Sequence, residues 1–172
     1  MLNVLTKLKL INKLLLVFLC VSLSACGFHL RGTSSLEGVE KIVYLDAPRG
    51  SFEQQLLDDL RVSGVQLSNE QKASDWHLKV SQARSNREIN TLNERGTVDS
   101  YRLSFIVTYS VLDADNKLLR APQTLTESRQ YVFNPVDIVE SEFEEDALRN
   151  GMEKDISLRI IRHLSELHAN GG

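Results

Sequence analysis

The residue with the clearest chemistry in this sequence is Cys26, which follows the tripeptide Leu-Ser-Ala at 23–25. Small residues before a cysteine let an extended chain enter a peptidase cleft, and the thiol is a nucleophile that can accept a diacylglycerol group. The preceding residues have the order of a secretory signal, because three lysines come before an apolar stretch at 14–23. We therefore predict that a signal peptide at 1–25 is removed and that a lipidated Cys26 begins a bacterial lipoprotein.

An uncleaved membrane anchor and an ordinary signal peptide are the alternatives to lipidation. The apolar stretch is shorter than the ~20 residues that a transmembrane helix needs. Two or more acyl chains anchor a protein stably, whereas a single chain binds a membrane only marginally. Gly27 stands where an aspartate would retain a lipoprotein in the inner membrane, so the sequence favours the outer membrane.

Composition limits what the rest of the chain can do. The 172 residues carry a net charge of −3, and removal of the three signal lysines takes it to −6. An acidic protein of this kind is a poor candidate for nucleic-acid binding. Cys20 leaves with the signal and Cys26 is acylated, so no thiol remains for a disulfide, a metal site or catalysis.

Hydrophobic periodicity in the first half predicts a strand, a helix and a second strand. The strand covers 39–45, and the helix begins at Ser51, where Gln54 three residues later completes a capping box. Gly64 ends this helix, because glycine readily adopts the left-handed conformation there. Strict alternation of apolar and polar residues then starts at Trp76.

The second half predicts two more strands and a long helix. An alternating strand covers 101–111, a turn follows at 113–116, and the last strand runs from about 124 to 133, with Pro122 at an edge or bulge. The helix extends to about residue 168, capped by Asp137 or, preferably, by Ser141. Its predicted apolar stripe consists of Phe143, Ala147, Ile156, Ile160 and Leu164, supplemented by Leu148, Met152 and Leu167.

These elements predict an α/β fold: a two-layer sandwich in which a mixed sheet of about four strands carries both helices on one face. A single domain occupies 39–168, preceded by the lipidated N-terminus and a short linker at 26–38 and followed by a frayed tail at 169–172. The strand connection through the first helix predicts a parallel pair. The opposite face of the sheet is polar, which suits either solvent or a partner.

Catalytic motifs are missing from the sequence. It contains no Gly-x-Ser-x-Gly elbow, no phosphate loop and no His-Glu-x-x-His pair. His163 and His168 are five residues apart, whereas histidines that share a metal on a helix are four apart, so we expect both to be surface residues. We therefore predict no enzyme activity, no catalytic residue, no metal site and no cofactor.

Three short segments resemble a known family. The heptad CGFHLRG at 26–32 closely resembles the start of the mature outer-membrane lipopolysaccharide-assembly lipoproteins of the LptE family, also called RlpB. The segments LRVSGV at 60–65 and FNP at 133–135 resemble the end of that family's first helix and the break after its long strands. The resemblance spans nearly all of the mature chain.

The resemblance implies a lipid-anchored protein on the periplasmic side of the outer membrane. Such a protein plugs the lumen of a large β-barrel, LptD, helps that barrel assemble, and assists delivery of lipopolysaccharide to the outer leaflet. Two alternatives stay open. The chain could be a structural scaffold for the barrel without lipopolysaccharide binding, or a free-standing periplasmic lipid-binding lipoprotein.

Lipopolysaccharide phosphates would need cationic partners, and arginine binds phosphate in a bidentate manner. Residues 76–135 carry a net charge of +2, whereas 136–172 carry −5. Arg95, next to Gly96 at the expected tip between two long strands, is the first candidate, and Arg87 is the second. Each could instead be a solvated charge at a strand end. The other candidates are Arg84, Arg102, Arg120 and Arg129.

Overall fold

The computed structural model describes residues 41–171. Cys26, the predicted signal peptide and the predicted linker at 26–38 lie outside these residues. The elements are, in chain order, β1 (Ile42–Asp46), α2 (Ser51–Val62), β2 (Gln66–Ser68), a 3-10 turn (Gln71–Ala73), β3 (Trp76–Leu92), β4 (Val98–Asp113), β5 (Leu118–Val132) and α3 (Ile138–Ala169).

The strands form one mixed sheet in the order β2-β1-β3-β4-β5. Strand β1 is parallel to both β2 and β3, and the pairs β3–β4 and β4–β5 are antiparallel. The predicted parallel pair across the first helix is therefore confirmed. The sheet has five strands where about four were predicted, because β2 has only three residues and is too short to show alternation.

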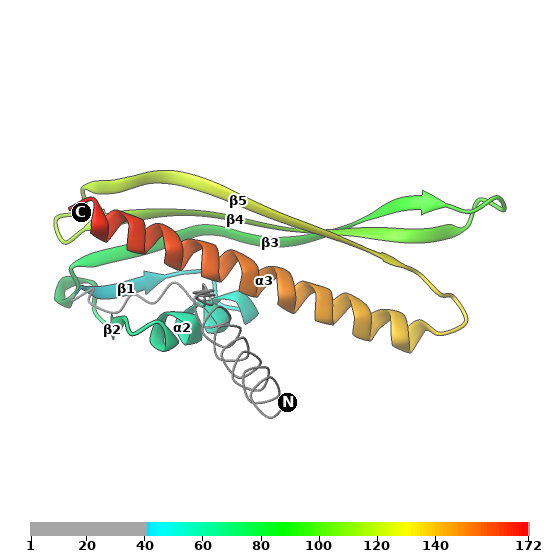
Figure 1. Ribbon diagram of the computed structural model, residues 1–172, viewed down its shortest axis with the longest axis horizontal. Helices are drawn as coiled ribbons and strands as arrows, with labels where there is room; N and C mark the ends of the chain where they lie inside the picture. Colours follow the sequence, from blue (N-terminus) through cyan, green and yellow to red (C-terminus); the bar gives the residue numbers. More distant parts are fainter. Residues whose placement is uncertain (1–40, 172) are drawn as a thin grey trace, which may run out of the picture. The chain divides into compact units, whose positions relative to one another are not determined.

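Helices α2 and α3 lie on the same face of this sheet, as predicted for a two-layer sandwich (Figure 1). The apolar side of β4 faces them and is almost fully buried. The Phe52 ring of α2 meets the Phe105 ring of β4 edge to face, with centroids 5.2 Å apart. The buried apolar residues of β4 are those predicted from alternation: Leu103, Phe105, Val107, Tyr109 and Val111.

The three antiparallel strands are longer than the sequence pattern indicated. Strand β3 continues to Leu92 and pairs with β4 as far as Val98, with a register shift between Val80 and Gln82. Strand β5 begins at Leu118 and has Pro122 within it. Proline cannot donate a ladder hydrogen bond, and Pro122 is tolerated because β5 is an edge strand with a register shift at this point, as predicted.

The start of α2 differs from the prediction, whereas its end agrees. The residue preceding the helix is Gly50, and no side chain caps it. The Ser51 hydroxyl instead donates to Glu153 of α3 at 2.9 Å, so a tertiary contact replaces the predicted capping box. At the other end, Gly64 has φ +86°, the left-handed conformation expected for a helix stop.

The cap of α3 is Asp137, so the preference for Ser141 was wrong. The Asp137 carboxylate accepts from the Glu140 backbone N–H at 3.1 Å, and the helix begins at the next residue, Ile138. Ser141 lies one turn inside, where its hydroxyl donates to the Asp137 carbonyl and accepts from the Asn134 N–H. The Ser141 hydroxyl, which the sequence analysis assigned to the cap, is thus used inside the first turn of the helix.

The predicted apolar stripe of α3 is correct only in its C-terminal two-thirds. Met152, Ile156, Ile160 and Leu164 are fully buried, together with Ile161. Phe143 is 72% exposed and Ala147 is also exposed, so both were wrongly assigned to the core. Helical periodicity extends the buried stripe from Met152 back to Glu145 and Ser141, and not to the aromatic residue.

Candidate functional site

The tip of the β3–β4 hairpin is a tight polar turn at 93–97. The Asn93 side-chain oxygen accepts from the backbone N–H groups of Arg95 and Thr97 at 3.0 and 3.1 Å. Gly96 has φ +75°, which a residue with a side chain rarely adopts. This geometry places Arg95 at the tip, as predicted, with its side chain exposed to solvent.

Arg87 lies on the same hairpin but faces α3. Its guanidinium donates to a carboxylate oxygen of Glu145 at 2.9 Å and stacks over the Tyr101 ring, 4.7 Å from the centroid. About half of the Arg87 side chain stays exposed, at 52%. The bond to Glu145 is the main cause that raises the pKa of Arg87.

Glu145 collects three donors at the interface between α3 and the sheet. Besides Arg87, it accepts from the Tyr131 hydroxyl at 2.7 Å and from Arg149, one turn further along α3, at 2.6 Å. Burial alone would raise the pKa of Glu145, but the hydrogen bonds from Tyr131 and Arg87 outweigh burial and leave this pKa below its ordinary value. Burial also raises the pKa of Tyr131 to about 12, so its hydroxyl remains a donor.

Sequence reasoning did not identify Glu145, which lies within an acidic run at 142–146 near the start of α3. The sequence nevertheless contains a pattern that could have identified this residue as buried. Counting back from Met152 in steps of three or four residues reaches 145 and 141, so the position belongs to the buried stripe. A carboxylate at such a position needs a cationic or hydroxyl partner across the interface.

The structure does not bring the two predicted arginines together. The five residue steps along the strand from Arg87 to Leu92 alone span roughly 16 Å, and Arg95 lies beyond them in the turn. Arg95 has an exposed side chain, whereas Arg87 is held against α3 by Glu145. A ligand that contacts both residues would have to lie along the hairpin.

The remaining candidate arginines take part in other contacts. Arg102 donates to Asn90 at 2.8 Å on the face of the sheet away from the helices. Arg129 forms an ion pair with Asp155 of α3 at 2.7 Å. Arg120 donates to the His163 carbonyl at 3.3 Å. Arg84 lines a cavity of about 200 Å³ at the start of α2, together with Arg149.

The face of the sheet that the helices leave free is polar, as predicted. Two cross-strand pairs on it are hydroxyl to hydroxyl: Ser104 with Ser128 at 3.1 Å, and Thr108 with Thr124 at 3.0 Å. Such pairs stabilise neighbouring strands without making the face apolar. The long strands therefore present a polar surface to solvent or to a partner.

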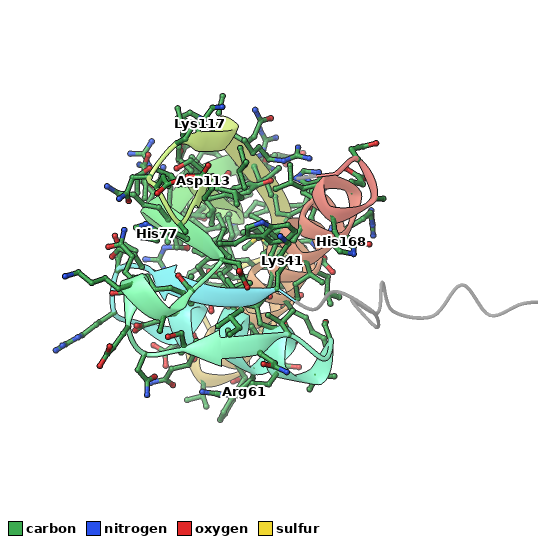
Figure 2. The ribbon with its side chains drawn as sticks, turned by 90° about the vertical axis from the view of Figure 1, so that its left-hand side faces the viewer. Lys41, Arg61, His77, Asp113, Lys117 and His168 are labelled. Carbon is green, nitrogen blue, oxygen red and sulfur yellow. The ribbon has the colours of Figure 1, made fainter. Side chains whose placement is uncertain are left out.

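The histidines on α3 are not simple surface residues, which corrects the prediction. His163 is half-buried and its Nδ1 hydrogen bonds with the hydroxyl of the buried Tyr109. Burial, with Arg120 as a second cause, lowers the pKa of His163. His168 lies edge to face against Trp76, with centroids 6.3 Å apart. Figure 2 shows His77 and His168 on opposite sides of one end of the domain.

Two further properties concern only residues 41–171. In this part of the chain, no three His, Cys, Asp or Glu side chains are arranged to hold a metal ion. Nor does any helix in it have the length and apolar character needed to cross a membrane.

Comparison with known proteins identifies a family. Residues 41–164 match the family model described as "LptE: Lipopolysaccharide-assembly". A curated relative, the LPS-assembly lipoprotein LptE of Pectobacterium atrosepticum, is 24% identical over 150 residues, which cover 86% of this chain and 80% of the relative.

Two solved structures share the fold. The solution structure of an uncharacterized lipoprotein B from Nitrosomonas europaea has a TM-score of 0.70 and 26% identity, and the match covers 84% of this chain and 94% of that one. The crystal structure of a minor lipoprotein from Acinetobacter baumannii has a TM-score of 0.61 and 28% identity, covering 74% and 92%. The match to the family model and these two structures agree on one fold for the described domain.

Proposed function

Because the chain belongs to the LptE lipopolysaccharide-assembly family, we propose that it is an outer-membrane lipoprotein that plugs an LptD-type β-barrel and helps it assemble. In this role it assists delivery of lipopolysaccharide to the outer leaflet. The observation that carries the proposal is the family match, which covers more than half of the chain and nearly all of the described domain.

The anchor in this proposal is a diacylglycerol on Cys26. Acyl chains there hold the domain at the periplasmic side of the outer membrane, since two or more chains anchor a protein stably. The 12 residues at 27–38 reach at most about 40 Å when fully extended. The domain therefore stays close enough to the membrane to enter the periplasmic end of a barrel.

The surface of the domain supports the plug role. The lumen of a large outer-membrane barrel is polar, so a plug needs polar surfaces to lie against it. The free face of β3, β4 and β5 carries hydroxyl, amide and arginine side chains, including the Arg102–Asn90 pair and the Ser104–Ser128 pair. An apolar face in this place would instead favour packing in a core or a lipid phase.

The proposed contacts to lipopolysaccharide are Arg95 first and Arg87 second. Arg95 stands at the tip of the hairpin with an exposed side chain, and no ion pair within residues 41–171 holds its guanidinium away from a phosphate. Arg87 is 52% exposed but bonded to Glu145, so its contribution is the smaller of the two.

The barrel contact is tested by detergent pull-down of the tagged, lipidated protein from outer membranes. A stoichiometric large β-barrel that survives stringent washing supports the proposal, whereas a protein recovered alone overturns it. Lipopolysaccharide contact is tested separately by comparing the wild type with Arg95→Ala, using Lys117→Ala at the opposite turn as the control. Equal lipopolysaccharide binding by all three would overturn the role of Arg95, and the absence of binding by the wild type would favour a scaffold that does not contact it.

A further inference from the structure

In the first turns of α3, polar side chains face the sheet and apolar side chains face solvent. Glu145 and Ser141 face inward and are buried, whereas the neighbouring apolar side chains face solvent. The exposed apolar residues that we call the apolar cluster are Val136 at 93%, Val139 at 61% and Phe143 at 72% exposed. A surface helix normally has the opposite arrangement.

The apolar cluster is compact along the chain. Val139 and Phe143 are four residues apart on α3, which places them side by side on one helix face. Val136 lies two residues before the helix begins at Ile138. In Figure 1 this end of α3 lies away from α2, β1 and β2, so those elements do not cover it.

The orientation of these turns is held by the inward side of the helix. Glu145 is bound by Arg87 and Tyr131 from the sheet. A rotation of the helix that turned Phe143 inward would move Glu145 outward and break both contacts. The apolar cluster therefore stays on the surface in this fold.

The charges around the apolar cluster indicate the charge that a binding partner should carry. Five exposed carboxylates surround it, and residues 130–148 contain no lysine, arginine or histidine. Among residues 41–171, no ion pair involves any of these five, which are Asp137, Glu140, Glu142, Glu144 and Asp146. Anionic lipid headgroups and lipopolysaccharide phosphates would be repelled here.

We propose that the apolar cluster is a protein-docking surface whose partner presents an apolar groove bordered by lysine and arginine. Apolar anchors in the centre with charges at the rim are the usual arrangement of such interfaces. The inference rests on the proposed function in one respect, because the partner is taken to be the same LptD-type barrel.

The test uses the full-length lipidated protein co-expressed with the barrel. A photo-crosslinking amino acid replaces Phe143 in one variant and Val62, an 84% exposed residue of α2, in the control. Position 143 is expected to crosslink to the barrel and position 62 is not. Phe143→Glu should reduce the recovered barrel at least several-fold, and Val62→Glu should leave it unchanged. Thermal unfolding of Phe143→Glu should match the wild type, because the side chain is exposed.

The outcomes separate the two proposals. If the wild type recovers no barrel, the proposed function fails and this inference fails with it. If the wild type recovers the barrel but positions 143 and 62 behave alike, only the docking surface is overturned. Crosslinking of position 143 to lipid instead of protein also overturns it. Charge complementarity adds one requirement, that Glu142→Lys weakens recovery of the barrel.

Discussion

Replacing Glu145 by alanine should destabilise the domain more than any other change at an acidic residue of α3. The carboxylate is the single acceptor shared by Arg87, Tyr131 and Arg149, with distances of 2.9, 2.7 and 2.6 Å. Its side chain is only 12% exposed. The substitution removes all three bonds at once and leaves the donors in place.

The cost follows from how exposed each donor is. Arg87 and Arg149 are 52% and 36% exposed, so water replaces much of what they lose. Exposed pairs of this kind contribute about 0.2–1 kcal/mol each. Tyr131 is only 4% exposed, and a buried hydroxyl without a partner costs about 1–3 kcal/mol. Together these give a loss of about 1.4–5 kcal/mol in the free energy of unfolding.

The assay is urea unfolding of the lipid-free protein followed by circular dichroism, with hydrogen exchange to locate the effect. Glu144→Ala is the matched control, because Glu144 is the neighbouring residue on the exposed side of the helix. Its stability should stay within about 0.5 kcal/mol of the wild type. Amides in the first turns of α3 should exchange faster in Glu145→Ala alone.

The same residue predicts a dependence on pH. The pKa of Glu145 is lowered in the folded state, so its contribution is present above the ordinary value of 4.5 and is lost as the pH falls through the folded pKa. The difference in stability between the wild type and Glu145→Gln should therefore be constant near neutral pH and shrink in acid. If Glu145→Ala and Glu144→Ala are equally stable, the reasoning about this network is refuted.

Two other changes give distinct outcomes. Cys26→Ala should release the protein from membranes in a fractionation assay yet leave its unfolding curve unchanged, because residues within 41–171 pack against one another in a continuous buried core; an unfolded lipid-free domain would contradict this. The pKa of His163 is lowered by burial and by Arg120, so the unfolded chain binds a proton more readily and wild-type stability should fall as the pH drops below about 6.5. The urea midpoint of His163→Gln should depend less steeply on pH over the same range. Identical slopes for the wild type and the variant would show that this histidine does not cause the dependence.

Prediction from the sequence succeeded where the pattern is local and repeated. Alternation along β4 identified its buried apolar residues from Leu103 to Val111, and the αL glycine marked the end of α2. It failed where a side chain had a choice of partners. Ser51 and Ser141 both have the residue type of a helix cap, but each hydroxyl is used elsewhere, by Glu153 and by the first turn of α3.

The same distinction between local and long-range contacts applies to the two arginines of the candidate site. Arg95 could be placed at a tip because glycine and asparagine at neighbouring positions specify a turn. The role of Arg87 could not be predicted, because it depends on Glu145, which is 58 residues away along the chain. No local sequence pattern shows that two charged residues so far apart in the chain are in contact.

By itself, the sequence determined the order of the elements, the apolar side of each long strand and the chemistry expected at Cys26, since all three depend on residues close together in the chain. Only the tertiary structure decided which face of the first turns of α3 is buried. The apolar residues there suggested Phe143, but the ion-pair network with the hairpin sets the rotation of the helix. Turning Phe143 inward would leave the buried Tyr131 hydroxyl and Arg87 without their carboxylate partner, and a buried donor without a partner is costly.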